Sequence, residues 1–576
     1  MARGKAREPR RPGVGALAGL ALRQSLSGVL SHAGAGLWQR KLAGTPARIL
    51  FAPETLAPCD AEVAADIYSG VFALAGTTVD CEGRSPFALA PPTPEWGRAL
   101  HAFTWLVHLE ANASALSSNN ARALLDEWLG AKSAQSRMAQ APGVVAARLT
   151  AWLVESPLLL SGADSAFRLA FLRAIGRQMR RLERVTPRLA PSIEKIEAAA
   201  ALALAGTVVA EQTRLQRWAL SLLGEALRGQ ILPDGGHVSR NPEALVTILS
   251  AVVPVREALV RRQQPVPPHL GGAIDKMLPM LRFFTHDGGA LASFHGARPV
   301  APRVLAALSG FDDARGTASD NARYSGFQRM AAGDAVALFD TGLAPPPAFA
   351  RAACASALAL EFSHGGERIV AGCGALGTAR PAWASAARAT AAQSTLTLEE
   401  RNSARILGLW PLTAALGPVL FGGPGTVEVA REEGGVTASH DGYLAHFGVL
   451  HRRTLSLSSD GHWLEGTDAI LGQDKLAGTP FAIRFHLWPG IRVRLGRGRR
   501  NAMLRLPGGA IWLFGLDEGP QLALEDTVVL TAPDTVRRTI QIVIAGNTLT
   551  DDTIRWHIAR HGEPIADPAA EKDEPS

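Results

Sequence analysis

The chain has 576 residues, which is too long for one small domain, so two or three domains are expected. Apolar residues make up 47% and charged residues 19% of the sequence, a balance that allows large hydrophobic cores and excludes general disorder. The net charge of +7 is carried almost entirely by arginine, whose planar guanidinium group binds carboxylate, sulfate and phosphate groups, so an anionic ligand is expected.

The basic residues are spread along the chain and match no helix-turn-helix, zinc-finger or RNA-binding motif, so no nucleic-acid partner is predicted. The cysteines lack the paired spacing of a metal finger and do not require an oxidising compartment. No uncharged apolar run of about eighteen residues occurs, so the sequence predicts no transmembrane helix.

The first 45 residues begin with a basic stretch and a short apolar run over 13–22, as a signal peptide does. The run is only about ten residues long, Arg23 follows it, and no convincing cleavage site comes next. We therefore predict a basic tail followed by an amphipathic helix over 16–42. The compartment stays open between the cytoplasm and the cell envelope or periplasm, and residues 563–576 are predicted to be a disordered tail.

Between residues 46 and 320, apolar side chains recur at helical spacing, and Pro, Gly or Asp turns separate the periodic segments. This pattern predicts an array of helical hairpins without a fixed repeat period. The expected helices cover residues 96–109, 120–129, 144–160, 165–182, 193–205, 211–227, 242–262 and 268–284.

Beyond about residue 330 the apolar period becomes two, and Gly-rich turns separate many short segments. We place the boundary near 320, within a window of 310–345, because residues 327–338 already resemble a strand pair. The pattern predicts an antiparallel β-sandwich over 321–562 and no βαβ units. The clearest strands are 357–364, 394–400, 425–431, 451–458, 481–487, 491–495 and 539–544.

A polar segment over residues 230–243 separates two of the predicted helices. Pro233 to Gly236 must be a turn, and Asn241 followed by Pro242 is typical of a helix start. His237, Arg240 and Asn241 are thereby presented at a helix N-terminus, where an anion can be held. An ordinary capped connection between two helices would have the same pattern.

Five segments, in order, resemble the heparinase II/III-like family: residues 232–243, 281–296, 389–396, 439–453 and 484–489. The resemblance implies a multidomain protein in which an incomplete (α/α) toroid precedes an antiparallel β-sandwich. It also implies a lyase that cleaves uronic-acid polysaccharides by β-elimination. That reaction needs a group that neutralises the uronate, a base for the C5 proton and an acid for the leaving oxygen.

Three motifs depart from the family pattern. Ala244 and Leu245 stand where the family has the catalytic Tyr and the His that follows it. Gln393 replaces a His, and Val107 occupies the position of an expected Asn before His108. These departures put standard lyase catalysis in doubt.

We expect His237, Tyr324 and His286 to be catalytic. We also expect His237, Arg240, His286 and Tyr324 to converge on one cleft between the two halves. The residues expected to bind substrate are Arg240, Asn241, Arg282, His295, His440 and Tyr443. No cofactor is predicted. Some family members bind zinc in the sandwich, which makes His486 a weak candidate ligand, although a buried histidine with hydrogen-bond partners is the simpler interpretation.

Three functions remain open. The first is a polysaccharide lyase acting on an anionic glycan. The second is a catalytically altered protein on the same scaffold that binds carbohydrate or associates with envelope glycan. The third is an inverting hydrolase, which would need two facing carboxylates from among Glu110, Asp234, Glu243 and Asp287. The sequence does not indicate the polymer or the oligomeric state.

Overall fold

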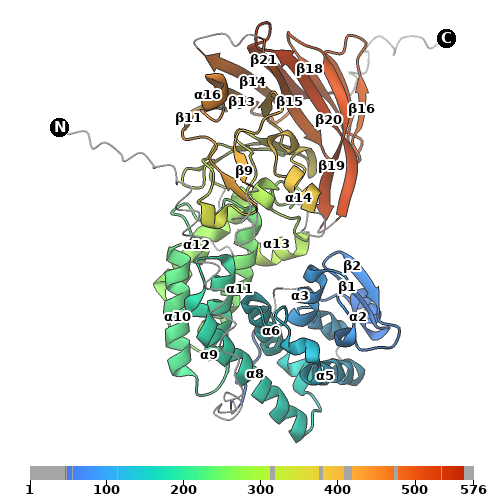
Figure 1. The fold of residues 1–576 in the computed structure, drawn as a ribbon, viewed down its shortest axis with the longest axis vertical. Coiled ribbons are helices and arrows are strands. Elements are labelled where there is room, and N and C mark those ends of the chain that lie inside the picture. The colour runs from blue at the N-terminus through green and yellow to red at the C-terminus, as the bar shows by residue number, and fades with distance from the viewer. Residues whose placement is uncertain are drawn as a thin grey trace, which may run out of the picture.

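The chain folds into a helical half and a β-sandwich stacked along the long axis of the molecule (Figure 1). The predicted N-terminal helix and C-terminal tail lie outside the residues that the structure describes. The structure is a computed structural model that describes residues 46, 48–54, 56, 58–112, 114–311, 318–374, 381–407, 418–472, 478–532 and 535–562.

The helical half is an array of antiparallel helices around α9, whose residues 198–208 are almost completely buried. None of the described helices is both long enough and apolar enough to span a bilayer. The helices are α2 (Ala61–Tyr68), α3 (Pro94–Ala102), α4 (Leu106–Leu109), α5 (Ala115–Gly130), α6 (Pro142–Val154), α7 (Ser156–Leu160), α8 (Ser165–Val185), α9 (Ile193–Val208), α10 (Thr213–Arg228), α11 (Pro242–Arg261), α12 (Pro268–Phe283) and α13 (Pro302–Ser309).

Two of the predicted helices are interrupted. The segment expected as one helix over 96–109 ends at Phe103, which adopts a left-handed backbone conformation (φ 58°) and begins a turn before α4. The segment over 144–160 is divided at Glu155, directly before Ser156 and Pro157. A short hairpin of β1 (Val71–Leu74) and β2 (Thr77–Asp80) beside α2 was not predicted.

Helices α9 and α10 approach closely because Gly206 lies at their contact. A Cβ atom built on Gly206 would be 2.7 Å from the backbone N and Cα atoms of Gln216. The amide of Gln216 donates to the hydroxyl of Thr207 on the facing helix (3.1 Å). Backbone contact at this distance is possible only without a side chain at position 206.

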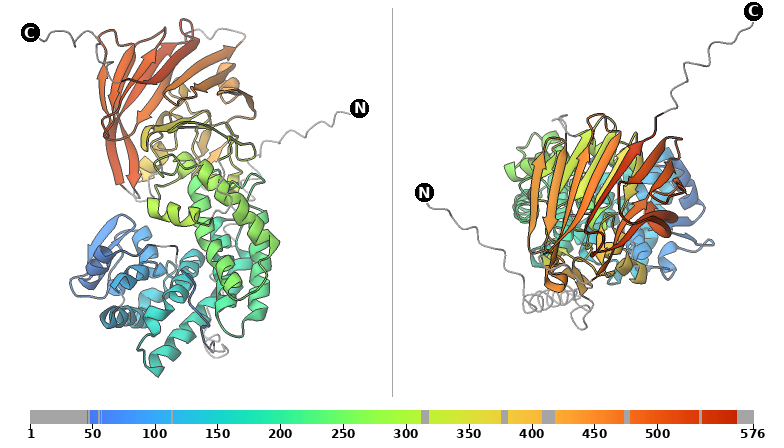
Figure 2. Two further views of the ribbon diagram at one scale, coloured as in Figure 1. Left: turned by 180° about the vertical axis from the view of Figure 1, so that it is seen from behind. Right: turned by 90° about the horizontal axis from the view of Figure 1, so that it is seen from above.

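The C-terminal half is an antiparallel sandwich, as predicted, with an apolar core that includes Phe485, Trp512 and Trp556 (Figure 2). Every strand pair in the described residues is antiparallel. One sheet contains β3 (Asn321–Ala322), β4 (Phe327–Ala332), β5 (Ala335–Asp340), β6 (Leu360–His364), β7 (Glu367–Ala371), β8 (Leu396–Leu398), β15 (Pro480–Leu487), β19 (Leu522–Ala532) and β20 (Thr535–Asn547).

The second sheet covers the other side of that core. It contains β11 (Val427–Glu432), β12 (Gly435–His440), β13 (Val449–Leu457), β14 (Trp463–Gly472), β16 (Arg492–Leu495), β17 (Asn501–Arg505), β18 (Ile511–Leu516) and β21 (Thr553–Arg560). A separate pair, β9 (Arg405–Leu407) and β10 (Val419–Phe421), lies on the side of the sandwich nearer the helices (Figure 1). The last helix of the helical half ends at Ser309, and the first strand of the sandwich begins at Asn321, beside the proposed boundary at 320.

Candidate functional site

The polar segment 230–241 forms a tight turn between α10 and α11. Gly235 has φ 91°, and a Cβ atom on it would lie 2.0 Å from the carbonyl oxygen of Lys276 on α12. Asn241 caps α11 as predicted, because its side-chain oxygen accepts from the N–H of Glu243 (2.8 Å). The turn is therefore fixed by close packing on one side and by a cap on the other.

Arg240, in the same turn, reaches across to the sandwich. Its side chain is buried, and its guanidinium carbon lies 4.5 Å from the ring centre of Phe327. The guanidinium group donates hydrogen bonds to the carbonyl oxygens of Ser325 (2.7 Å), Gly326 (2.8 Å) and Leu343 (3.0 Å) and to the carboxylate of Asp340. Arg240 is thus bound to the protein's own acceptors.

Asp340, at the end of β5, is a buried carboxylate with partners from both halves. Nε2 of His295 lies 3.0 Å from the Asp340 carboxylate and 2.9 Å from the guanidinium group of Arg240, while Nδ1 accepts from the N–H of Cys354. The hydroxyl of Ser356 also donates to Asp340 (2.7 Å). Burial opposes ionisation of Asp340, but Arg240 and His295 outweigh it and hold the pKa of the carboxyl below its usual range.

A second buried carboxylate, Glu361 on β6, holds His286 in the same way. His286 lies 3.1 Å from Glu361 and 2.8 Å from the hydroxyl of Ser363. Arg368 (2.6 Å) and the hydroxyl of Ser293 (2.8 Å) donate to Glu361. Burial lowers the pKa of His286, so this ring is neutral near pH 7.

Asp234 and Tyr324 also meet at the junction, through the backbone. The Asp234 carboxylate accepts from the N–H groups of Tyr324 (2.8 Å) and Ser325 (2.6 Å) and from the Ser325 hydroxyl (2.8 Å). The Tyr324 side chain itself is 60% exposed. The expected common cleft of His237, Arg240, His286 and Tyr324 is not formed, because the first three side chains are buried and only Tyr324 faces solvent.

His237 has both ring nitrogens engaged within its turn. Nδ1 accepts from the N–H of Ser239 (3.2 Å), and Nε2 lies 3.2 Å from the amide oxygen of Gln230. The ring also makes an edge contact with Phe349. Burial lowers the pKa of His237 to about 4, so the imidazole is a weak base in the folded protein.

His440 belongs to a buried relay in the sandwich. Its Nε2 lies 3.3 Å from Nδ1 of His451, whose Nε2 lies 2.7 Å from Asp468. Arg453 donates to the same carboxylate (2.8 Å), and burial lowers the pKa of His440 well below its usual range. The relay ends inside the protein, because Nδ1 of His440 accepts from the N–H of Gly442 (3.0 Å).

Tyr443 packs beside His440, with 5.5 Å between ring centres, and its hydroxyl donates to the carbonyl of Leu396 (2.8 Å). Burial raises the pKa of Tyr443 beyond its usual range, so this phenol stays protonated. Arg282 is half-buried in the last turn of α12. Tyr443 and His440 are close together, and the charge of Asp340, the partner of Arg240, also acts on His440.

His486 does not fit a zinc site. Its Nδ1 lies 3.0 Å from the hydroxyl of Thr527, and its Nε2 donates to the carbonyl of Ala391 (3.0 Å). Gln393 is buried, with its amide donating to the carbonyl of Ala387 (2.9 Å). No group of three His, Cys, Asp or Glu side chains in the described part of the chain is arranged to hold a metal ion.

An open groove of about 810 Å³ lies next to the family-like motifs on the side of the sandwich, and we call it the β9–β10 groove. Behind it, Arg240, His295 and Asp340 line a void of only about 10 Å³, which has no room for a sugar unit. The groove is lined by Leu343, Ala344, Pro345, Pro346, Pro347, Glu400, Arg401, Asn402, Ser403, Ala404, Arg405, Ile406, Leu407, Leu420, Phe421, Gly422, Gly423, Pro424, Gly425, Asp441, Gly442, Ala445 and His446.

The β9–β10 groove contains two exposed arginines and two carboxylates. Arg401 and Arg405 are exposed, and Arg401 makes only a loose contact with Glu399 at 3.9 Å. Both carboxylates already have partners: Glu400, whose side chain is 63% exposed, pairs with Arg484 (2.7 Å), and Asp441 accepts from the N–H of Gly425 within the groove (2.6 Å). Two guanidinium groups in one groove suit a carboxylate-bearing or sulfated ligand.

Local backbone strain also marks the groove. Glu399 and Glu400 are consecutive non-glycine residues with φ values of 46° and 54°. Each such conformation costs about 1–2 kcal/mol, and strain of this kind clusters at functional sites. Arg401, Arg405 and His446 were not among the predicted site residues; the polar run directly after the strand predicted at 394–400 is the one local signal for them.

The carboxylates considered for a hydrolase are not paired across a cleft. The Asp234 carboxylate already accepts hydrogen bonds from Tyr324 and Ser325, and Glu243 binds Arg298 (2.6 Å). Glu110 and Asp287 are exposed, on a 3₁₀ turn and on the loop after α12. An inverting mechanism needs two carboxylates facing one another across the bond that breaks.

The comparisons with known proteins agree with this architecture. The family model described as "Heparinase II/III-like, C-terminal" matches residues 314–557. The crystal structure of heparinase III is similar over 96% of this chain and 92% of its own, with a TM-score of 0.67 and 13% identity. Heparan sulfate lyase HepC from Pedobacter heparinus is similar over 95% and 88% of the two chains, with a TM-score of 0.55 and 14% identity.

A sequence relative is more similar than these structures. "FtsZ-localized protein C" of Caulobacter vibrioides is 32% identical over 476 residues, which cover 80% of this chain and 81% of the relative. The low identity to the lyases shows a shared fold only, whereas this relative is similar along most of its length. The chain therefore belongs to the heparinase II/III-like family, and within it is a relative of FtsZ-localized protein C.

Proposed function

We propose that this protein binds an anionic, uronate-bearing glycan in the β9–β10 groove without cleaving it. The observation that carries the proposal is the composition of the groove. Its described lining presents two exposed arginines, Arg401 and Arg405, but one histidine and no tyrosine. Such a lining can neutralise the uronate carboxylate, which is the first requirement of β-elimination. It lacks a pair of side chains to take the C5 proton and to protonate the leaving oxygen.

The positions of the family's catalytic residues support the same proposal. Ala244 and Leu245 are buried in α11, and Gln393 is buried against a backbone carbonyl. His237 and His440, which were expected to act in catalysis and substrate binding, are enclosed and hydrogen-bonded. A side chain that takes a proton from a sugar must reach it within hydrogen-bond distance, directly or through one water.

A lyase acting by β-elimination on a uronic-acid glycan is the second candidate. The fold shared with heparinase III favours it, and so does His446, an exposed histidine in the groove beside the two arginines. A lyase would produce an unsaturated uronate, which absorbs in the ultraviolet, whereas a binding protein would not.

One experiment separates the two candidates. Binding of tetragalacturonate and of heparan sulfate tetrasaccharide is measured by calorimetry, and the same mixtures are followed by ultraviolet absorbance. We expect binding without unsaturated product, and a loss of affinity of about tenfold or more in Arg401→Ala/Arg405→Ala. Arg537→Ala/Arg538→Ala, on the exposed surface of β20, is the matched control and should bind as the wild type does. Ultraviolet-absorbing product that disappears in His446→Ala would establish the lyase instead.

We also propose that this protein localises with FtsZ, as the name of its relative states for that protein. The similarity along four-fifths of both chains supports this. A fluorescent fusion expressed in the source cells should coincide with labelled FtsZ. A fusion distributed without regard to FtsZ would refute the localisation and leave the glycan proposal to its own test.

A further inference from the structure

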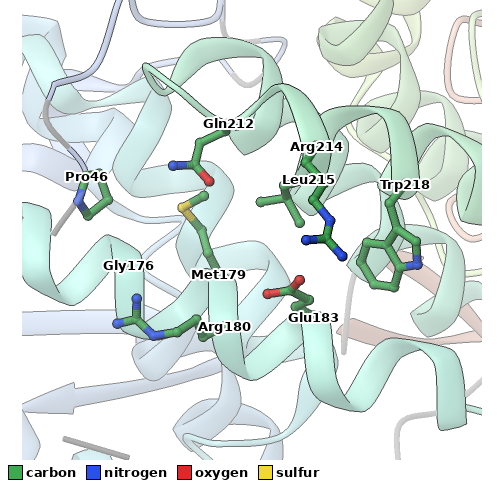
Figure 3. Close-up of a pocket in the computed structure, with 9 residues that line it drawn as sticks. All are labelled: Pro46, Gly176, Met179, Arg180, Glu183, Gln212, Arg214, Leu215 and Trp218. Atoms are coloured by element: carbon green, nitrogen blue, oxygen red, sulfur yellow. The ribbon is translucent and has the colours of Figure 1, made fainter. Parts of the chain in front are cut away.

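A second pocket, of about 600 Å³, lies between α8 and α10 (Figure 3). Because α10 runs toward the junction at its C-terminal end, this pocket at its N-terminal end lies far from the sandwich (Figure 1). Its apolar walls come from Met179, Leu215 and Trp218. Its charged groups are Arg180, Arg214 and Glu183, whose carboxylate points toward Arg214 in Figure 3.

Glycine and proline shape one end of this pocket. Gly176 lies in the interior of α8, where glycine weakens a helix. A Cβ atom on Gly176 would be 3.0 Å from the ring of Pro46 and 3.4 Å from the guanidinium group of Arg180. The glycine therefore gives Pro46 and Arg180 room to line the pocket together.

A stripe of arginines runs along α8 beside the pocket. The positions recur every three or four residues and so lie on one face of the helix, over about 22 Å. Arg180 belongs to both the stripe and the pocket, and its pKa is lowered by burial and by the charges of Arg177 and Arg184. The stripe consists of Arg173, Arg177, Arg180, Arg184 and Arg188.

Like charges at this spacing destabilise a helix, and an anionic partner would relieve the repulsion. Across the pocket, α10 adds Arg214 and Arg217, and the one carboxylate among the pocket's lining residues is Glu183. Cations thus outnumber carboxylates around a pocket that combines polar and charged groups with the side chains of Met179, Leu215 and Trp218. Arg, Trp and Met are the residue types enriched where proteins bind one another.

We propose that the pocket and the arginine stripe form a docking surface for an acidic peptide segment of a partner protein. One bulky apolar side chain of the peptide enters the pocket between Met179, Leu215 and Trp218. Carboxylates on either side of it pair with Arg180, Arg214 and the rest of the stripe. This surface is separate from the β9–β10 groove, so its function does not depend on glycan binding.

Charge argues against the protein's own N-terminal segment as the occupant. Residues 1–45 lead to Pro46 but contain eight Lys and Arg residues against one acidic residue, Glu8. A peptide suits the pocket better than a glycan does, because a peptide can offer one apolar side chain to Met179, Leu215 and Trp218 and carboxylates to the arginines around them. An apolar peptide side chain gains free energy by burial against such apolar side chains, which a sugar hydroxyl does not.

The test uses fluorescence anisotropy of the full chain with a labelled probe peptide, Glu-Asp-Glu-Glu-Leu-Glu-Glu-Asp-Glu. We expect saturable binding that weakens as salt is added. Replacing the central Leu of the probe with Gly should weaken binding about tenfold, which corresponds to loss of one buried apolar side chain. Arg180→Glu/Arg214→Glu should weaken it at least as much. Arg214→Ala, at an exposed position, repeats the test if the double variant does not fold, as judged by circular dichroism.

The matched control is Arg537→Glu/Arg538→Glu, which makes the same charge change on the sandwich and should leave probe affinity unchanged. Equal losses in the two double variants would show non-specific attraction and overturn the proposal. So would the absence of probe binding, or equal affinity for the Leu and Gly probes. A heparin octasaccharide tests the remaining alternative. If it displaces the probe and binds the Trp218→Ala variant as tightly as the wild type, the surface binds polyanions in general and is not a peptide site.

Discussion

At the scale of single residues, the side chains that most resemble a catalytic set hold the two halves together. Arg240 and His295 come from the helical half and end on Asp340 of β5. His286 ends in the same way on Glu361 of β6. A buried charge is tolerated when it is paired and hydrogen-bonded. Asp340 meets that condition only when both halves are present, whereas Glu361 also pairs with Arg368 of β7 inside the sandwich.

Replacing Arg240 with Ala should destabilise the protein strongly. The change leaves Asp340 buried without its cation, which typically costs about 3–5 kcal/mol. Arg240→Lys should also destabilise it, because an ammonium group cannot donate to the same spread of acceptors. Thermal unfolding followed by circular dichroism measures the effect, with Arg537→Ala as the exposed control; a midpoint equal to that of the control would contradict the assigned role.

The protonation of His237 should make stability depend on pH. Its pKa is about 4 when folded and 6.5 for an ordinary histidine, so the unfolded chain binds more protons between these values. The contribution is present above pH 6.5 and is lost as the pH falls to about 4, by up to about 3 kcal/mol. In His237→Gln the melting temperature should fall less steeply with pH over this window than in the wild type. Parallel curves for the two proteins would exclude the effect.

The sequence located the turn that holds these residues but not their partners. The polar segment, the glycine turn and the Asn241 cap are local patterns, and all three are present in the structure. The acceptors of Arg240 lie between 85 and 103 positions away, a separation about which local pattern carries no information. The sequence pattern of a helix N-terminus that presents cations is the same whether those cations bind a ligand or another part of the protein.

At the scale of elements, α9 is the helix around which its half is built. Its alanines let neighbouring helices approach, and Gly206 brings the backbone of α10 within contact. Periodicity predicted α8 to α12 well, because long amphipathic or buried helices repeat their pattern over many residues. It failed at Phe103, where a left-handed residue ends α3 inside an apolar run, and at the hairpin of β1 and β2, which is too short to show a period.

Gly206→Ala should destabilise the protein although alanine is the better helix former. The added methyl group would meet the Gln216 backbone at 2.7 Å, and such overpacking costs about 1–3 kcal/mol. Gly130→Ala is the matched control, because no atom lies within 4 Å of the added Cβ atom. Thermal midpoints should fall for the first variant and stay level or rise for the second. A rise in both would show that α9 and α10 can move apart without loss.

At the scale of the whole molecule, the two halves should unfold as one unit. Asp340 and Glu361 lose their His and Arg240 partners if either half unfolds. Calorimetry should show one main transition for the wild type and two for Asp340→Asn/Glu361→Gln, whose amides no longer bind the junction cations. Asp320→Asn, at an exposed pair with Arg431, should keep the single transition. A single transition in the double variant would mean that other contacts couple the halves.

The position of Arg240 in the chain also has a consequence during synthesis. A ribosome adds about 5–20 residues per second, so Asp340 follows Arg240, 100 positions earlier, after about 5–20 s. Once Ser309 has been added, the helical half is complete in sequence, but Arg240 still lacks its carboxylate partner and the apolar surface at the junction is still uncovered. The helical half therefore reaches its final state only when β5 and β6 have left the exit tunnel. Nascent chains arrested before β6 has emerged should depend on chaperones more than those arrested after it.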